Sequence, residues 1–259
     1  MRGKMKYTRY MIFPLLILNL TAAIGFTDED SDKLPIFFKS ISVKESEKLK
    51  KIVEGKDTFI EWREEEIETT PFIFNYLLNR PVMTSNILKE LGIAAYQIEK
   101  DGDLLQFDDG EGFSSEFKTI YKKGENKIYL GNYIYTTGIG VPVRLSGEWA
   151  SVLRYKKKEG GMEIDIDLYL KSDEQGLSKV TKNIPFIIKS VIGEKADSYI
   201  ESIRELSEWI HKDPGEVYNL LKDSRELNSK ELNEFKERFL LLSLPFHTSQ
   251  VSLCQSSSH

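Results

Sequence analysis

The sequence predicts an α+β fold, in which an antiparallel sheet is covered by a long C-terminal helix and small helical extensions stand at both ends. Two hydrophobic periods predict it. Through much of 96–170 apolar residues occupy every second position, and over 177–210 they recur at spacings of three and four. The first period is typical of half-buried strands and the second of an amphipathic helix. A further strand is expected at 57–66, where aromatic and β-branched residues suit a pleated surface.

Residues 1–25 have the three parts of a secretory signal peptide. Four basic residues lie in 1–9, an apolar run follows at 10–20, and the small residues Ala23 and Gly25 suit a signal peptidase. The run is short for a bilayer span, although an uncleaved membrane anchor stays open as the alternative. We therefore expect export to the periplasm or the extracellular space, with membrane contact only if the segment is not cleaved.

The net charge of the chain narrows the class of binding partner that is expected, and its cysteine content shows whether a disulfide can stabilise the core. The chain has 36 basic and 41 acidic residues, and removal of the four basic residues of 1–25 leaves 32 and 41. An acidic chain of this kind excludes nucleic acid as the expected partner, because nucleic acid is bound by basic surfaces. It also disfavours electrostatic docking on anionic lipid headgroups. The single cysteine, Cys254, cannot form an internal disulfide, so the core must be stable without one.

Residues 26–56 are expected to form an acidic lead-in followed by a short helix. Ser42 with Glu45 suits a helix cap, and Gly55 suits the end of the same helix. Val43 is expected on its narrow apolar stripe.

A pair of helices is expected between the first strand and the rest of the sheet. Thr70 followed by Pro71 is typical of a helix start, since a hydroxyl cap precedes a proline at the first helical position. Pro81 ends this helix, and a second one is expected at 82–91, closed by Gly92.

The strands of 96–170 are expected to form antiparallel hairpins with one dry face and one largely wet face. Three tyrosines alternate with aliphatic residues on one strand and are expected to be partly exposed, so that they are candidates for stacking on a ligand: Tyr129, Tyr133 and Tyr135. Gly-rich or charged turns separate the strands at Lys123–Asn126, Thr137–Gly138 and Lys158–Gly161.

The long helix is expected to be kinked or segmented at Pro185 and Gly193. It ends at 213–215, where Asp, Pro and Gly follow one another. A helical extension at 212–244 should hold helices at about 215–222 and 229–243, and the Ser-rich tail 245–259 is expected to be disordered.

The residues that carry a family resemblance are the helix pair at 70–92, the strands that end at Leu170 and the helix at 184–210. Their order over about 57–211 resembles the START-like, helix-grip (SRPBCC-type) superfamily of hydrophobic-ligand-binding domains. The resemblance implies a curved sheet folded around the C-terminal helix, with a cavity between them that binds a lipid, sterol-like or aromatic molecule. The kinks expected in the long helix depart from the superfamily pattern.

The function expected from this resemblance is that of an exported, non-enzymatic protein that binds a lipid or other hydrophobic small molecule between sheet and helix. The residues expected to line the site are Trp149, Leu153, Ile166 and Leu168 on the sheet and Tyr199, Ile200 and Ile203 on the helix. The same faces would pack into an ordinary filled core if no cavity were left, since close packing is the default for protein interiors.

Two other functions stay open. The chain could be a structural or protein-interaction domain of the cell envelope, with a filled core and a docking element of apolar residues: Phe235, Phe239, Leu240, Leu241 and Leu242. An enzyme of the aromatase or cyclase type would need polar groups that converge inside a cavity.

No catalytic residues, metal ligands or cofactor are predicted. The chain has three histidines, two of them in or near the tail, which disfavours a zinc site. The acidic stretches 101–103 and 108–111 do not have the spacing of calcium loops and are expected to be hairpin turns. His211 is expected at a helix end, where a cation is favourable.

Overall fold

The computed structural model describes residues 40–136, 144–173 and 184–241. The chain divides into two units, Met1–Lys33 and Leu34–His259, and the described residues all belong to the second. Several predictions made from the sequence lie outside the described residues: the signal peptide, the acidic lead-in, the turn at Thr137–Gly138, the first part of the long helical pattern, and the tail.

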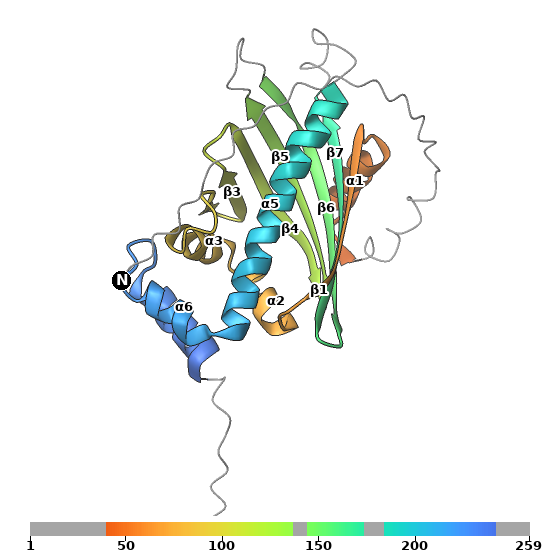
Figure 1. Ribbon diagram of the computed structural model, residues 1–259. Helices are drawn as coiled ribbons and strands as arrows, with labels where there is room; N and C mark the ends of the chain where they lie inside the picture. The colour runs from red at the N-terminus through yellow and green to blue at the C-terminus, as the bar shows by residue number, and fades with distance from the viewer. Residues whose placement is uncertain (1–39, 137–143, 174–183, 242–259) are drawn as a thin grey trace, which may run out of the picture. The chain divides into compact units, whose positions relative to one another are not determined.

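One antiparallel sheet of seven strands runs through the described residues, in the order β1-β7-β6-β5-β4-β3-β2 (Figure 1). After β1 the chain crosses through two helices to the opposite edge and then returns strand by strand toward β1. The predicted turns at Lys123–Asn126 and Lys158–Gly161 are confirmed as the β4–β5 and β6–β7 connections. The strands are β1 (Thr58–Ile67), β2 (Gln97–Asp101), β3 (Leu104–Asp108), β4 (Phe113–Lys123), β5 (Asn126–Thr136), β6 (Arg144–Lys158) and β7 (Gly161–Ser172).

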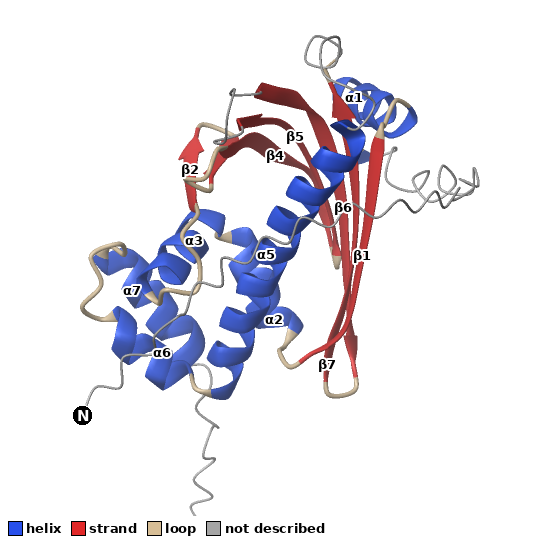
Figure 2. Ribbon diagram, turned by 45° about the horizontal axis from the view of Figure 1, so that its top comes forward, coloured by secondary structure: helices blue, strands red, loops and turns tan. Residues whose placement is uncertain are grey.

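Helix α5 (Ile184–Lys212) crosses one face of the sheet as a single continuous helix (Figure 2). The prediction that Gly193 would kink or segment it is wrong. For Pro185 it stays a prediction, because the helical run expected before Ile184 lies outside the described residues. Within the described residues Pro185 is the second residue of the helix, where a backbone N–H has no intrahelical acceptor, so the missing N–H removes no bond. Gly193 lies within the helix, and a β-carbon at that position would be 3.7 Å from Cδ1 of Ile60 on β1.

Helix α1 (Val43–Glu54) covers the other face of the sheet. It is capped by Ser42 and ends at Gly55, as predicted, and it packs on apolar residues of β5, β6 and β7. The prediction of one largely wet face is therefore wrong for these strands, because Ala150 and Val152 stand among the charged residues of that face and are fully buried under α1. Val43 does not join this contact and is 75% exposed.

Four short helices gather at one end of α5. They are α2 (Pro71–Asn79), α3 (Pro81–Glu90), α6 (Pro214–Leu221) and α7 (Ser229–Phe235), and α7 continues into a π-helix at Lys236–Leu241. The predicted start of α2 is confirmed by the bond from the Ile73 N–H to the Thr70 hydroxyl, and the predicted stop of α3 by the positive φ of Gly92. The cap of α7 at Asn228 is also confirmed, although the α-helical part stops at Phe235 rather than at 243.

The residues expected to form a docking element lie mostly inside the molecule. Phe235 and Phe239 are 0% and 2% exposed, and their ring centroids are 4.8 Å apart. Phe239 also packs edge-on against Tyr76 of α2, at 5.0 Å. Leu240 is half-buried, Leu241 is 53% exposed, and Leu242 lies outside the described residues. The prediction of an apolar docking surface here is wrong for the two phenylalanines, because they close the core beside α2.

Two glycines allow large side chains to lie across the sheet. Gly131 is directly opposite Trp149 on the next strand, and a β-carbon at Gly131 would be 2.6 Å from the indole Nε1 and from a backbone oxygen. Gly147 is opposite Tyr133 in the same way, and a β-carbon there would be 2.8 Å from the phenol oxygen. No side chain larger than hydrogen fits at either position unless both the aromatic residue and a neighbouring backbone oxygen move, since the β-carbon would lie 2.6 Å from the Glu116 oxygen at Gly131 and closer still to the Lys171 oxygen at Gly147.

The first prediction concerns the packing of the C-terminal helices. Phe235→Ala should lower the free energy of unfolding by about 3–5 kcal/mol, because it leaves a cavity in a fully buried cluster. Leu241→Ala, on the same segment but exposed, should change it by less than about 0.5 kcal/mol. Urea unfolding followed by circular dichroism measures both, and equal effects of the two substitutions would contradict the packing described here.

The second prediction uses the two glycines that differ most in their surroundings. Gly131→Ala should destabilise the protein by about 1–3 kcal/mol, as expected for overpacking, and should shift the tryptophan emission because Trp149 must move. Gly193→Ala should stabilise it by up to about 1 kcal/mol, since alanine is the better helix former and has room there. Urea unfolding measures the change in the free energy of unfolding for both variants. A stabilising effect of Gly131→Ala would show that Trp149 does not lie over that strand.

Candidate functional site

A cavity of about 970 Å³ lies between the sheet and α5. The close backbone contacts of α5 are with β1, α2, α3 and α6 rather than with the central strands of the sheet, so space is left over the middle of the sheet. The sheet is irregular at two places, where β-bulges interrupt β1 between Glu64 and Ile67 and β4 between Thr119 and Tyr121. Bulges of this kind bend a strand and increase its twist.

The mouth of the cavity is marked by the lining residues that are exposed: Arg80, Lys100, Asp103, Thr119, Lys122, Asn228 and Lys230. Two of them, Thr119 and Lys122, lie on the part of β4 that continues to Lys123 after the β3–β4 pairing has stopped at Leu105 and Phe117.

Six of the seven residues predicted from the sequence line this cavity. Trp149 and Leu153 contribute from β6, Ile166 and Leu168 from β7, and Tyr199 and Ile200 from α5. Ile203 does not line it. One helical turn beyond Tyr199, it is fully buried in the cluster that α5 forms with α2 and α6. That these side chains bind a ligand stays a prediction.

Trp149 is held across the floor of the cavity by a hydrogen-bond chain. Its Nε1–H donates to Oγ of Ser115 on β4 at 2.9 Å, and the Ser115 hydroxyl donates to the carbonyl of Asn132 at 2.8 Å. The indole thus crosses over Gly131 to reach β4. Because its N–H is satisfied within the protein, Trp149 presents an apolar ring to the cavity.

Tyr129 and Tyr199 place polar groups inside the apolar cavity. Both side chains line it, and neither hydroxyl forms a hydrogen bond with another described residue. Burial raises the pKa of Tyr129, and burial raises the pKa of Tyr199 to about 12. Both phenols are therefore protonated at neutral pH and can donate a hydrogen bond to a bound molecule. Two of the three tyrosines singled out in the sequence, Tyr129 and Tyr133, line the cavity, whereas Tyr135 packs partly buried beside them.

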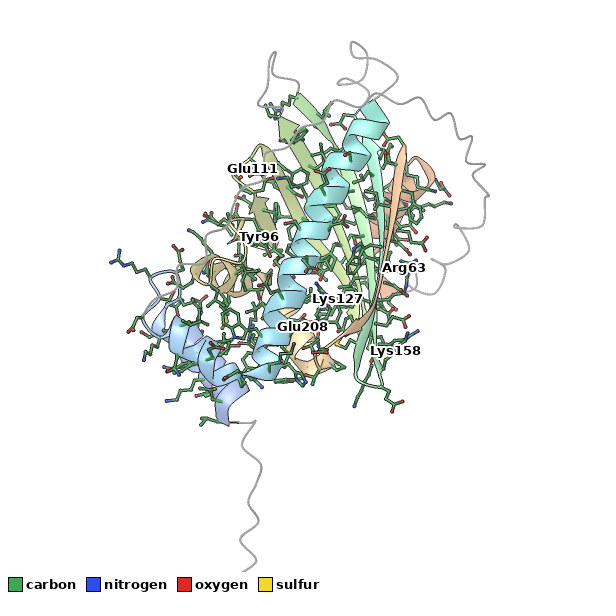
Figure 3. All side chains as sticks on the ribbon, in the orientation of Figure 1. Arg63, Tyr96, Glu111, Lys127, Lys158 and Glu208 are labelled. Carbon is green, nitrogen blue, oxygen red and sulfur yellow. The ribbon has the colours of Figure 1, made fainter. Side chains whose placement is uncertain are left out.

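Sequence reasoning missed a buried lysine next to the cavity. This residue is Lys127, which Figure 3 labels, and it is 1% exposed. Its ammonium donates to Oδ1 of Asn79 at 3.0 Å and lies 5.9 Å from the centroid of the Tyr155 ring. Burial and, to a smaller extent, the charge of Lys122 together lower the pKa of Lys127 to about 7. Its position in the alternation with Tyr129 would have placed it on the cavity face, and this is the signal that could have found it.

The described residues contain no group of three His, Cys, Asp or Glu side chains arranged to hold a metal ion. The acidic stretches at 101–103 and 108–111 are turns, as predicted, with positive φ at Gly102 and Gly110. His211 is exposed in the last turn of α5, also as predicted. None of the helices in the described ranges is long and apolar enough to cross a membrane.

Comparisons with known proteins find similarity in structure only. No family model matches the sequence, and no curated protein gives a significant match. Among solved structures, Ara h 8.0201 is 10% identical with a TM-score of 0.40, and the alignment covers 58% of this chain and 97% of that one. A START superfamily protein from Mycobacterium smegmatis is 10% identical with a TM-score of 0.37, over 59% of this chain and 98% of the other.

A third similar structure is the di-domain ARO/CYC protein BexL, which is 8% identical with a TM-score of 0.41, over 61% of this chain and 53% of that protein. Similarity at this level says nothing about what this chain binds. The fold follows from the chain's own elements, because a seven-stranded antiparallel sheet is crossed by one long C-terminal helix, with two short helices between its first and second strands. These elements confirm the predicted α+β helix-grip fold.

Proposed function

We propose that this chain is an exported protein that binds a lipid or another hydrophobic small molecule in the cavity between the sheet and α5, without transforming it. The observation that carries the proposal is the cavity of about 970 Å³ and its largely apolar lining. Small-molecule sites in proteins are concave, mostly apolar and furnished with a few polar groups, at volumes of about 300–1,000 Å³.

Packing energetics support the same conclusion. Protein interiors are close-packed, and side chains around a void lose the dispersion contacts that neighbouring atoms would give them. The rings of Trp149 and Tyr199 and the aliphatic side chains of Leu153, Ile166 and Leu168 stand around this void. An apolar ligand would restore those contacts and remove its own surface from water, which is worth about 25 cal/mol per Å² of apolar area.

The lining supports binding better than catalysis. No histidine or cysteine is among the described residues that line the cavity. Its two free phenols have raised pKa values and are poor bases at neutral pH. The Ser115 hydroxyl is occupied by its bonds to Trp149 and to the backbone. These groups can orient a ligand, but they do not form a nucleophile and base pair.

The alternative of an envelope interaction domain has less support from the described residues. It required a filled core and an exposed apolar segment at the C-terminal end. The cavity occupies the centre of the fold, and Phe235 and Phe239 of that segment are buried.

The third prediction tests the cavity with a neutral apolar probe, 1-aminoanthracene. The purified protein should enhance the probe's fluorescence on titration, and native mass spectrometry should detect any apolar molecule that co-purifies and is lost on denaturation. Ala196→Trp, on the cavity side of α5, should weaken probe binding by at least about tenfold, because the indole occupies the space the probe needs.

The matched control is Ser198→Trp, which adds the same side chain to an exposed position of the same helix. It should leave probe binding unchanged. Absence of both a co-purified molecule and probe binding in the folded wild-type protein would rule out a ligand-binding cavity.

The fourth prediction concerns export. Expression of the whole chain in a bacterium should yield an exported form whose intact mass lacks residues 1–25 and whose first residue is Phe26. Ala23→Leu, which enlarges a side chain that the peptidase must accommodate, should block cleavage and leave the full-length mass in the membrane fraction. Full-length wild-type protein in the membrane would instead support the uncleaved anchor, and full-length protein in the cytoplasm would contradict export.

A further inference from the structure

Two lysines stand directly opposite each other on the cavity face of the sheet. Lys122 on β4 pairs with Lys127 on β5, and Lys122 lines the cavity at its mouth. The bulge between Thr119 and Tyr121 produces this arrangement, because it shifts the register by one residue and turns Tyr121 toward α1 on the opposite face. Like charges at directly opposed positions destabilise a sheet, so this pair needs an explanation.

The surroundings of Lys127 do not neutralise its charge. Asn79 is a neutral partner, and its Nδ2 donates to Oδ1 of Asn75, which fixes the amide so that its own oxygen faces the lysine. The bond to Asn79 uses one of the three N–H groups of the ammonium. Among the described residues, no carboxylate lies within ion-pair distance of Lys127 or Lys122.

Three of the other basic side chains that line the cavity, Arg80, Lys118 and Lys195, are paired with acids, whereas Lys100 and Lys230 are exposed at its mouth without an ion pair among the described residues. Arg80 at the mouth bonds to Glu234 of α7 at 2.7 Å, and Lys195 of α5 bonds to Asp109 at 2.7 Å and to Glu111.

Lys127 differs from all of these basic side chains because it is buried. It does not itself line the cavity, but Lys122 and Leu153, which pair with it across the strands, and Asn79, which bonds to it, do line it. A buried ammonium is costly unless an anion accompanies it.

We infer that the cavity binds an amphiphile whose anionic group, a carboxylate or a phosphate, lies against Lys122 and Lys127 while its apolar part extends toward Trp149 and Leu153. This inference rests on the proposed function and names the class of ligand. The anion would accept the free N–H groups of Lys127, and charge-assisted hydrogen bonds of this kind are the stronger ones in proteins. Burial already holds the pKa of Lys127 near 7 without a ligand, and a bound anion would raise it.

The fifth prediction compares probes that share one apolar chain and differ in the head group. Oleic acid, oleyl alcohol and 1-oleoyl lysophosphatidic acid are each titrated, below their aggregation concentrations, against protein loaded with 1-aminoanthracene. The wild-type protein should bind one or both anionic probes at least about tenfold more tightly than the alcohol. A difference in affinity of this size is what one charge-assisted hydrogen bond provides. Preference for the phosphate would identify a lipid headgroup as the source of the anion, and preference for the carboxylate a free fatty acid.

Substitutions test whether the two lysines cause the preference. Lys127→Met and Lys122→Met should each reduce it to less than about threefold while leaving oleyl alcohol binding unchanged. Lys123→Met is the matched control, because it removes the same charge from the next residue of β4, which is exposed and does not line the cavity. It should retain the wild-type preference. Since Lys122 is exposed, its substitution tests the inference even if Lys127→Met does not fold.

The outcomes separate this inference from the proposed function. If the wild-type protein binds neither anionic probe more tightly than the alcohol, or if both lysine variants keep the preference, the anion site is wrong and the cavity still binds apolar molecules. If no probe displaces 1-aminoanthracene and the dye itself does not bind, the proposed function fails.

Discussion

The cavity depends on one geometric constraint, which is that α5 approaches the edge of the sheet and the short helices but not the central strands. A helix of 29 residues is about 43 Å long at 1.5 Å per residue, enough to cross the sheet and rest on contacts at its margins. Over the middle of the sheet, side chains must fill the space or leave it empty. Trp149 does not project far into it, because it lies across Gly131 and bonds to Ser115.

Different contacts hold α5 in place at β1 and at the end where the short helices gather. At the β1 side, α5 passes Ile60 at Gly193, where a β-carbon would lie 3.7 Å from Cδ1 of Ile60. At the other end, the C-terminal helices complete the core, with Phe235 and Phe239 packed beside α2. The segment after α5 therefore belongs to the same packing unit as the sheet and α2, and its apolar residues stabilise the frame around the cavity.

The position of charge in the fold is as informative as the apolar lining. Some charged side chains near the cavity mouth form ion pairs that link separate elements, as Arg80 and Glu234 link the α2–α3 junction to α7. Lys127 has only a neutral partner among the described residues, and that partner is oriented by a second amide. Burial of the Lys127 ammonium does not favour stability, because a methionine of similar size would pack at this position with a smaller desolvation penalty. Binding of an anionic ligand explains the buried lysine better than stability does.

The sequence by itself determined the local features of this protein. The hydroxyl cap and proline at Thr70–Pro71, the stop at Gly92, the cap at Asn228 and the two-residue period of the strands each act through their own neighbours, so they could be predicted without knowledge of the fold. Of the six predicted residues that line the cavity, four followed from this strand period, and Tyr199 and Ile200 from the helical period, once the helix was taken to cover the sheet.

Only the tertiary structure decided which face each covering helix protects, whether the space beneath α5 is filled, and which charges are buried. The helix stays continuous through Gly193, where it contacts β1. Ile203 lies beyond the cavity because α2 and α6 pack there. Lys122 lies directly opposite Lys127 because of a β-bulge that the local sequence pattern does not predict. Each of these depends on residues far apart in the chain, and long-range contacts are what a sequence pattern does not contain.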